Sequence, residues 1–263
     1  MIPNFPDFKC LTWNDKEEVG QFTKDFPPYS DFNFTSLYAW NIDDKVKVSK
    51  LNGNLVVLFS DYLTGKPFLS FLGCKNVSDT ASSLIEYSRS NFNEPSLKLV
   101  PEIVVHSLCA KTFTISEDRD SFDYIYSTSN FYDLPQWPAK YRASQQARTF
   151  IKTQNDYYTK CFSIREIDSG VLLKLYKQWA FNRGIDYLAT NEFRAFQRLF
   201  IEDDKTSYSL ILYIAGVPKG FVLFEILPNK FAINHFSKAD ISYKGIYETM
   251  HWHTAKTLYS KGI

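Results

Sequence analysis

The stretch that most constrains the fold is Ser207–Ser260, which predicts three short β-strands followed by one helix. The strands are expected at Leu210–Ala215, Phe221–Leu227 and Phe231–Phe236, which are mostly apolar and rich in residues that favour strands. Turn sequences separate them, at residues 216–220 and 228–229. Such short connections favour an antiparallel meander, and the helix that ends near Ser260 then covers one face of it.

A polar junction, Lys238–Gly245, leads from the third strand into this final helix. The free backbone N–H groups and the dipole at a helix start favour negative charge. The junction therefore suits an anionic or acyl-bearing ligand. The alternative is an antiparallel sheet covered by a helix with an ordinary cap, and the sequence leaves both readings open.

The same order of elements occurs in the first half of the chain, which indicates a structural duplication. There, helices are expected over Lys16–Phe26 and Ser36–Asn41, strands at Val46–Leu51, Leu55–Phe59 and Pro67–Leu72, and a closing helix over Ser78–Asn91. In the second half, Asp168 or Ser169 is expected to cap the first helix and Asn191 the second. These elements predict an α+β protein of two tandem domains, residues 1–130 and 131–263, each with a mostly antiparallel mixed sheet flanked by helices.

The two halves differ after their closing helices. In the first half, strands are expected at Leu97–Val100, Phe113–Ile115 and Asp123–Tyr126, with a short helix after Pro101. A linker over Asn130–Pro138 and a basic helix over Ala139–Thr153 follow. The second half ends at Ile263, directly after its closing helix, so either other strands complete it or its C-terminus is truncated. We expect truncation.

Composition narrows the class of protein. The chain has 30 Lys and Arg against 29 Asp and Glu, so it has no overall positive field for nucleic acid, although a local basic patch is not excluded. Its N-terminus lacks the basic and apolar regions of a secretory signal, and its apolar runs are far shorter than the roughly 20 residues that span a bilayer. Four scattered cysteines suggest free, mostly buried thiols. We therefore predict a cytoplasmic protein without a transmembrane segment.

Three strings resemble the family that includes the C-terminal domain of phosphatidylglycerol lysyltransferases. They are Tyr29–Trp40 (YSDFNFTSLYAW), Tyr132-Asp133-Leu134 followed by Lys140-Tyr141-Arg142, and His235–Asp240 (HFSKAD) followed by Gly245 and Tyr247. They occur in the order of the family's own segments and span most of the chain. The helix, helix, meander, helix order is similar to the GNAT acyltransferase superfamily, and its doubling to the tandem members that include the FemABX transferases.

This resemblance implies two GNAT-like domains and an acyl- or aminoacyltransferase, with aminoacyl-tRNA as donor and a lipid headgroup or other small molecule as acceptor. Two departures bear on these partners. The segment Ser144–Arg148 is sparser in Lys and Arg than its counterpart in the family, which weakens the case for binding tRNA or phospholipid. The junction at Lys244-Gly245 lacks the glycine-rich loop that cradles the pyrophosphate of acetyl-coenzyme A, so this cofactor is not supported.

The catalytic candidates are His235, Lys238, Asp240 and Tyr247. If Asp240 holds Lys238, the ammonium could meet a phosphate or carboxylate while His235 acts as an acid or base. The structural alternative is a salt bridge at the strand end and a buried sheet histidine.

The substrate-binding candidates fall into three groups. Trp179, Arg183 and Glu192 could line an acceptor pocket, although a tryptophan on an apolar stripe more often belongs to the core and Glu192 suits the helix dipole. Tyr141 and Arg142, on the basic helix, could contact tRNA or lipid phosphates. The alternative is that the basic residues of this helix only form a face exposed to solvent. Lys244 and Gly245, the last two residues of the polar junction, form the third group.

No metal site is predicted. His251 and His253 lie two apart on the final helix and point to nearly opposite sides, so they cannot share one ion. The alternative to the transferase hypothesis is a non-catalytic binding protein on a degenerate GNAT scaffold, which the missing glycines favour.

Overall fold

Two-residue turns with positive φ angles fix the strand pairing in both halves of the chain. Asn52 (φ 54°) and Gly53 (φ 77°) connect one hairpin, and Ala215 (φ 49°) and Gly216 (φ 75°) connect another. This conformation matches the twist of antiparallel strands, so the flanking residues pair directly. The second turn is shorter than the expected segment 216–220, because β7 already begins at Val217.

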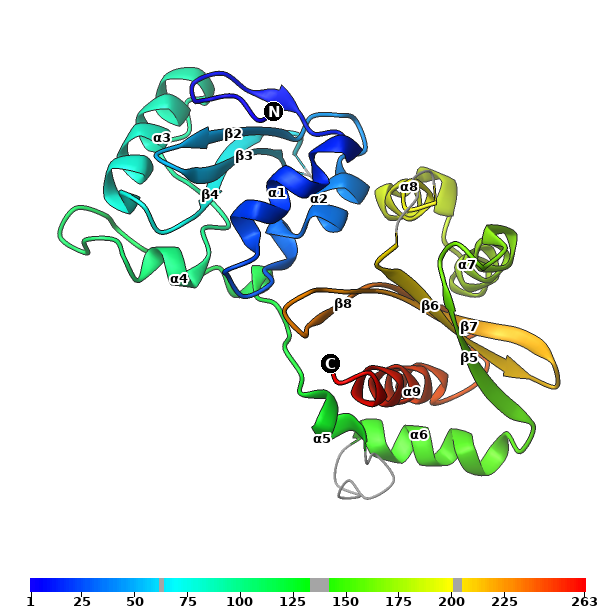
Figure 1. The fold of residues 1–263 in the computed structure, drawn as a ribbon. Helices are drawn as coiled ribbons and strands as arrows, with labels where there is room; N and C mark the ends of the chain where they lie inside the picture. Colours follow the sequence, from blue (N-terminus) through cyan, green and yellow to red (C-terminus); the bar gives the residue numbers. More distant parts are fainter. Residues whose placement is uncertain (62–63, 133–141, 201–204) are drawn as a thin grey trace. The chain divides into compact units, whose positions relative to one another are not determined.

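A computed structural model describes residues 1–61, 64–132, 142–200 and 205–263 of the chain. These form two units, Met1–Asp123 (unit 1) and Tyr124–Ile263 (unit 2), each with a four-stranded antiparallel sheet flanked by helices (Figure 1). The boundary expected after residue 130 falls inside helix α5, Thr128–Tyr132. This helix belongs to unit 2 because it is bonded to α9 and the chain end: Trp252 Nε1 donates to Tyr132 O at 3.1 Å, and Thr128 Oγ1 to Ile263 O at 2.7 Å.

Unit 1 has the strand order β1-β2-β3-β4. Its strands are β1 (Lys9–Cys10), β2 (Lys47–Leu51), β3 (Asn54–Ser60) and β4 (Pro67–Leu72). Its helices are α1 (Lys16–Thr23), α2 (Phe34–Trp40), α3 (Val77–Phe92) and α4 (Glu102–Val105), with 3-10 turns at Trp13–Asp15, Ser30–Phe32 and Arg119–Ser121. The side chain of Asn33 caps α2 by accepting from Ser36 N at 2.8 Å.

Unit 2 has the strand order β5-β6-β7-β8. Its strands are β5 (Tyr157–Ser163), β6 (Ser207–Ile214), β7 (Val217–Ile226) and β8 (Ala232–Ala239). Besides α5, its helices are α6 (Arg142–Thr153), α7 (Ser169–Arg183), α8 (Asn191–Arg198) and α9 (Ile246–Ser260), with a 3-10 turn at Tyr187–Ala189. Helices α7 and α8 cover one face of the sheet, and α9 covers the other with α6 packed on it (Figure 1).

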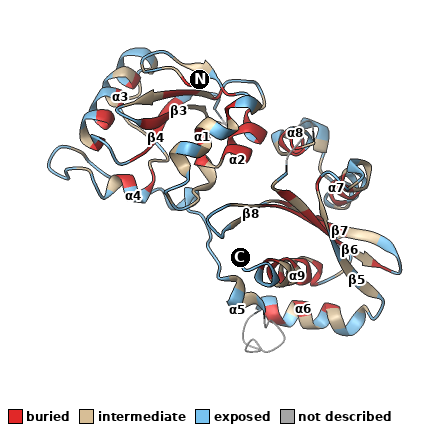
Figure 2. Ribbon diagram, in the orientation of Figure 1, coloured by how far each residue is buried: buried red, intermediate tan, exposed pale blue. Residues whose placement is uncertain are grey.

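Each sheet is buried by the helices that cover it, and buried positions gather on its central strands (Figure 2). In unit 2 the α9 face combines aliphatic side chains such as Leu212 and Val222 with Met250 and the rings of Phe150 and Phe224. The α7/α8 face is aromatic, and Phe196 contacts both Phe221 and Phe236 with ring centroids 5.6 Å apart. The sheets and helices expected from the apolar patterns are therefore confirmed in their main outline.

Three strands expected after α3 are wrong. Residues 93–127 contain α4 and one 3-10 turn but no strand. Leu99 has a φ of 55°, which interrupts an extended conformation at Leu97–Val100. Further on, Ile115 and Tyr124–Tyr126 are largely exposed, with Tyr124 87% exposed. Strand-forming residues there meet no partner strand among the described residues, and propensity alone does not make a sheet.

Two smaller expectations are also wrong. Thr190, and not Asn191, caps α8, since its side chain accepts from Phe193 N at 3.3 Å. The four cysteines are free, as expected, but all of them are exposed rather than mostly buried.

Two partly buried titratable groups should give the units opposite responses to acid. In unit 2, His253 of α9 lies 3.3 Å from the Tyr157 hydroxyl, and burial, aided by the charge of Lys256, lowers its pKa to about 4. In unit 1, burial and the charge of Asp123 raise the pKa of Asp31 to about 6. Burial disfavours the charged form of each group.

Between pH 6.5 and 4, we expect His253 to destabilise unit 2 and Asp31 to stabilise unit 1, each by up to about 3 kcal/mol. The unfolded chain takes up the His253 proton first, so this stability is present above pH 6.5 and lost as the pH falls through 4. Folded unit 1 takes up the Asp31 proton first, so that stability is present below pH 4 and lost as the pH rises through 6. Hydrogen exchange measured across this range should show both slopes.

The variants His253→Gln and Asp31→Asn separate the contributions of these two groups from those of the other titratable groups in each unit. Each should flatten the pH dependence of its own unit and leave the other unit unchanged. Wild-type slopes in both variants would contradict the assignment.

Candidate functional site

Helix α7 presents two aromatic rings to the last part of strand β8. Its start is fixed by Asp168, which accepts from Gly170 N at 2.8 Å, and its end by Gly184 in the left-handed conformation (φ 65°). Tyr176 and Trp179 both lie on its buried face, with their ring centroids 5.5 Å apart. They form the wall against which Lys238 of β8 packs.

Lys238 is a buried cation in an aromatic and acidic surrounding. The residue is 6% exposed, and its Nζ lies 3.7 Å from the Trp179 ring centroid and 5.3 Å from that of Tyr176. Nζ also donates to Glu192 Oε1 at 2.7 Å. Ring faces and a carboxylate both favour a cation, so this surrounding compensates the loss of water around the ammonium.

Glu192, and not Asp240, is therefore the ion-pair partner of Lys238, which corrects the pairing expected from the sequence. Glu192 lies in the first turn of α8, and the Tyr176 hydroxyl donates to its second oxygen at 3.1 Å. Burial and the nearby charge of Glu192 raise the pKa of the Tyr176 phenol, which keeps it protonated. The side chain of Glu192 is 36% exposed, so one side of this carboxylate faces solvent.

Asp240 follows β8 and ties four segments together. Its Oδ1 accepts from Asn182 Nδ2 at 3.0 Å and from the backbone and hydroxyl of Ser242, and its Oδ2 accepts from Lys219 Nζ at 3.4 Å. Partial burial would raise the pKa of Asp240, but the Ser242 and Lys219 hydrogen bonds outweigh it and lower the pKa. This carboxylate thus stays ionised and holds α7, β7 and the β8–α9 junction in place.

Tyr247 supplies a neutral hydroxyl at the same strand end. Its oxygen accepts from Ala239 N at 3.2 Å. Burial raises the pKa of the phenol, while the bond from Ala239, the charge of Arg183 and a hydrogen bond from the Trp179 side chain oppose the shift in part. The hydroxyl therefore keeps its proton at neutral pH and can donate it to a carbonyl or phosphate oxygen. Arg183 is exposed, 6.0 Å from the Trp179 ring centroid.

His235 lies in a separate, sealed position on β8. Its side chain is 5% exposed, and its Nε2 lies 3.5 Å from Glu225 Oε2 of β7 without forming a hydrogen bond within the described part of the chain. Glu225 in turn accepts from Thr206 Oγ1 at 2.9 Å. The pairing register of β7 and β8 shifts at this place, between Leu223 and Phe224. His235 thus sits at a bulge, beneath the surface and three residues before Lys238.

Gly245 packs closely against helix α6. Its φ is 88°, and an added Cβ would collide with the backbone oxygen of Gln146 on α6 and lie 3.1 Å from Phe150 Cβ. Helix α6 thus covers the α-carbon of Gly245, so the packing gives this glycine a structural role. Lys244 beside it is exposed. Arg142, also exposed, begins α6 on the opposite face of the sheet from Lys238, and Tyr141 lies outside the described residues.

The structure thus brings Trp179, Arg183, Glu192, Lys238, Asp240 and Tyr247 to one end of β8, and leaves His235, Gly245 and Arg142 elsewhere. Sequence reasoning missed Tyr176 and Lys219. The position of Tyr176, three residues before Trp179 on the same stripe, could have indicated that both rings face one neighbour. Lys219 had no such signal, because the register of β7 against β8 brings it to Asp240.

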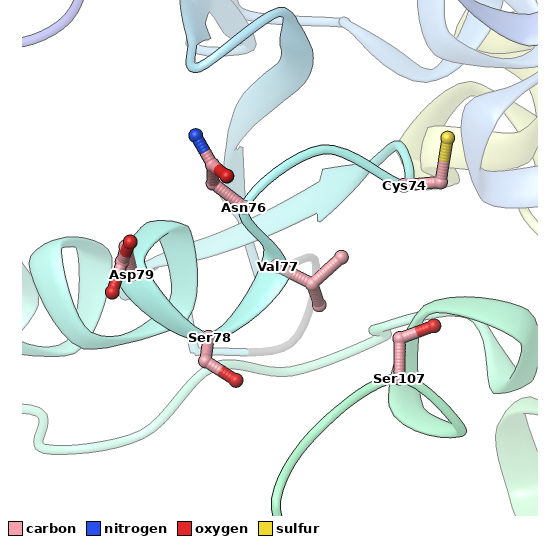
Figure 3. Close-up of a pocket in the computed structure, with 6 residues that line it drawn as sticks. All are labelled: Cys74, Asn76, Val77, Ser78, Asp79 and Ser107. Carbon is pink, nitrogen blue, oxygen red and sulfur yellow. The ribbon is translucent and has the colours of Figure 1, made fainter.

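A separate open hollow of about 260 Å³ lies at the start of α3 in unit 1 (Figure 3). It is lined by Cys74, Asn76, Val77, Ser78, Asp79 and Ser107. The acidic Asp79 in the first turn opposes the attraction of the helix dipole for an anion. None of the residues predicted from the sequence lines this hollow.

Neither a metal site nor a membrane span is found in the described ranges. No three His, Cys, Asp or Glu side chains there gather closely enough to hold an ion. No helix in the same ranges is long and apolar enough to cross a bilayer.

Comparisons with known proteins agree with this fold. A conserved protein of unknown function from Bacteroides thetaiotaomicron VPI-5482 has a similar structure, with a TM-score of 0.74 and 23% identity over 98% of this chain and 86% of that one. The C-terminal domain (DUF2156) of a proposed lysylphosphatidylglycerol synthetase from Agrobacterium fabrum has a TM-score of 0.58 and 10% identity over 95% of this chain and 75% of that one. A search of curated proteins finds no match.

The sequence profile of the family described as "Phosphatidylglycerol lysyltransferase, C-terminal" matches residues 23–263. The match includes all three strings on which the resemblance rested, and the resemblance is thereby confirmed. The chain belongs to the family of the C-terminal domain of phosphatidylglycerol lysyltransferases.

Proposed function

We propose that this protein is an acyl- or aminoacyltransferase of the GNAT superfamily, with its active centre at the end of β8 in unit 2. The observation that carries the proposal is the presence of a buried cation, Lys238, and a protonated hydroxyl, Tyr247, both beside Trp179 at one strand end. A fixed positive charge and a hydroxyl donor are what a developing oxyanion needs. Membership of a family named for lysyl transfer supports the same class of reaction.

Two tandem GNAT-like domains are the scaffold we propose. Both units contain one strand, two helices, a three-stranded meander and a closing helix in this order. The register is antiparallel throughout both sheets. This repeated order supports a duplicated domain, with the conserved geometry of the meander and its helix as the common element.

Aminoacyl-tRNA is the donor that the charge distribution favours. The chain as a whole is nearly neutral, but unit 2 has 18 Lys and Arg against 12 Asp and Glu, a formal net charge of +6. Unit 1 has 12 against 17, which gives −5. The whole chain is nearly neutral because the opposite net charges of the two units cancel, and unit 2 by itself is basic. A basic surface attracts the phosphates of a nucleic acid or an anionic lipid headgroup.

In the proposed reaction, a hydroxyl or amine of the acceptor attacks the ester carbonyl carbon of the donor. The Tyr247 hydroxyl donates to the carbonyl oxygen, and the positive charge of Lys238 stabilises the negative charge that develops there. Glu192, exposed on one side, takes the proton from the attacking group. The bond between the carbonyl carbon and the tRNA ribose oxygen then breaks, and this oxygen takes up the proton.

The remaining residues act indirectly in this proposal. Trp179 and Arg183 line the approach of the acceptor, and Arg183 can pair with a phosphate. Asp240 holds the strand end through Asn182 and Lys219. His235, next to Glu225 of β7, helps to position β8. Lys244 extends the basic surface toward the donor, and Arg142 adds positive charge on the other face of the sheet.

Tyr247→Phe is expected to lower kcat/KM for transfer by about 30- to 100-fold, a loss of roughly 2–3 kcal/mol of transition-state stabilisation. The matched control is Tyr243→Phe, which removes a neighbouring hydroxyl but keeps the ring that Lys219 approaches at 5.2 Å. The control should retain activity. Equal losses in both variants would contradict a specific role for Tyr247.

The direct test is to incubate the full chain with labelled lysyl-tRNA or alanyl-tRNA and phosphatidylglycerol vesicles. We expect label to appear in the lipid fraction, and filter binding at low salt to detect the tRNA complex. No transfer together with no tRNA binding at low salt would refute the aminoacyl-tRNA form of the proposal.

The second candidate is a non-catalytic binding protein on a degenerate GNAT scaffold. Two observations favour it: Lys238 is already neutralised by Glu192, and the α-carbon of Gly245 is covered by α6. A protein that binds tRNA without transferring its aminoacyl group would support this candidate over the first.

A further inference from the structure

The sheet of unit 2 aligns a row of residues across its four strands, on the face that α7 and α8 cover. Lys160 of β5 pairs with Ile211 of β6. Phe221 of β7 pairs with both Ile211 and Lys238 of β8. The ring of Phe221 contacts Phe196 of α8, which identifies the face. Lys160 therefore lies on the same face of the sheet as Lys238, at the other end of the row.

Two tyrosines stack on each other next to Lys160. Tyr158 of β5 and Tyr213 of β6 are direct partners across the two strands, with ring centroids 4.9 Å apart and an angle of 7° between the rings. Because side chains alternate along a strand, Tyr158 lies on the same face as Lys160. Helix α7 packs on β7 and β8, whereas Tyr158 of β5 is 39% exposed. The two rings thus offer an aromatic surface to solvent.

Positive charge lies at both ends of this row. At the β5 end, the exposed Lys160 has its Nζ 5.5 Å from the centroid of the Tyr158 ring. At the β8 end, Arg183 and Lys244 are exposed. The exposed Asp156, two residues before Tyr158, offsets one of these charges, but unit 2 as a whole has a net charge of +6. The surface therefore suits a ligand with several negative charges, such as a chain of phosphates.

Exposed aromatic rings beside a lysine are suited to an unpaired polynucleotide strand. Every nucleobase has a flat face that stacks on an aromatic side chain, and the phosphates of the strand bind a neighbouring cation. In a duplex the bases stack on one another, so their faces are not available to a protein ring. Strands β5 and β8 are three strand spacings apart, about 14 Å, a distance that a few unpaired nucleotides can span.

We propose that the two stacked tyrosines and Lys160 bind the unpaired end of an RNA strand. The rings stack its bases, Lys160 contacts a phosphate, and the terminus of the strand reaches Lys238 and Tyr247 at the end of β8. The choice of RNA rests on the proposed function, in which this strand is the end of aminoacyl-tRNA that carries the ester. Stacking requires no transfer, so the two proposals can be tested separately.

The test uses two fluorescein-labelled RNA hairpins with equal numbers of phosphates, one with an unpaired 3′ end of about four nucleotides and one with a blunt end. Binding to the full chain is measured by fluorescence anisotropy at low salt. We expect the hairpin with the unpaired end to bind about fivefold more tightly or better, because only its bases can stack on the rings. Uncharged tRNA should compete with it, and tRNA trimmed of its unpaired 3′ nucleotides should compete about fivefold less well.

Matched variants separate stacking from charge. Tyr158→Leu should weaken binding of the unpaired end about fivefold or more, whereas Tyr158→Phe keeps the ring and should bind as the wild type. Lys160→Gln should lower the slope of log Kd against log salt concentration by about one. Lys230→Gln, in the exposed turn between β7 and β8 at the opposite end of the sheet, should leave this slope unchanged.

The proposal is overturned if the blunt hairpin binds as tightly as the unpaired one, or if Tyr158→Leu leaves binding unchanged. The exposed substitution Lys160→Gln keeps the test valid if Tyr158→Leu fails to fold, and an unchanged salt slope would then overturn the proposal. Binding of the unpaired end without any aminoacyl transfer would support this site and count against the transferase proposal alone. Transfer that persists while Tyr158→Leu binds RNA as the wild type would overturn this site alone.

Discussion

Gly245→Ala is expected to destabilise unit 2 by about 3–5 kcal/mol, because two costs act at the same position. The φ of 88° is unfavourable for any residue with a Cβ, at roughly 1 kcal/mol. The new Cβ would also collide with the backbone oxygen of Gln146, which cannot rotate away as a side chain does. Helix α6 would have to move off the start of α9 and give up the packing of Phe150, which is completely buried.

Gly184→Ala is the matched control for this change. Gly184 has a similar φ of 65° at the end of α7, but nothing lies within 4 Å of an added Cβ. It should therefore show the backbone cost alone, about 1 kcal/mol. In calorimetry we expect the Tm of unit 2 to fall by roughly 10–15 °C for Gly245→Ala and about 3 °C for Gly184→Ala. Equal shifts would mean that contact with α6 contributes nothing.

Glu192→Gln is expected to destabilise unit 2 by about 2–3 kcal/mol, because it leaves a buried ammonium without its carboxylate. The ring of Trp179, 3.7 Å from Lys238 Nζ, compensates part of this loss. The exposed side of Glu192 moderates it further, since water screens the pair there. Urea unfolding followed by hydrogen exchange in α7, α8 and β8 would measure the change.

The double variant Lys238→Met with Glu192→Gln completes a mutant cycle. Methionine keeps the apolar packing against Tyr176 and Trp179 without the charge, so the double variant should recover most of the stability lost in Glu192→Gln. Lys174→Met, on the exposed side of α7, controls for the removal of a positive charge and should change stability by less than about 0.5 kcal/mol. If the two changes at Lys238 and Glu192 simply add, their pairing does not stabilise the fold.

The meander of unit 2 could be predicted because its information is local. Apolar runs and a Gly-containing turn specify β6, β7 and β8 within a few residues, and the polar junction with Gly245 marks the start of α9. The strands expected at residues 113–115 and 123–126 show where this reasoning fails. Tyr124, Ile125 and Tyr126 favour a strand, but a strand also requires a partner, which no local pattern supplies.

The candidate site could likewise be predicted only in part from the sequence. The sequence indicates that His235, Lys238, Asp240 and Tyr247 belong to one segment. By itself it suggests only a partner close in the chain, which makes Asp240 the expected partner of Lys238. The partner is Glu192, 46 residues away, because alternation directs Lys238 to the α7/α8 face of the sheet. The same alternation and the bulge near Leu223 place His235 beneath the surface beside Glu225.

The sequence by itself therefore determined the family, the α+β class, the order of the two helices, the three meander strands and the closing helix in each unit, and the segment that carries the candidate site. These features depend on the spacing of apolar residues, on turn residues and on short strings, all of which are read over a few neighbouring positions. The tertiary structure alone decided which groups meet: Lys238 with Glu192 and Trp179, Asp240 with Asn182 and Lys219, and Gly245 with Gln146. These contacts depend on strand register and on which helix covers which face, and both are settled only when distant segments pack together.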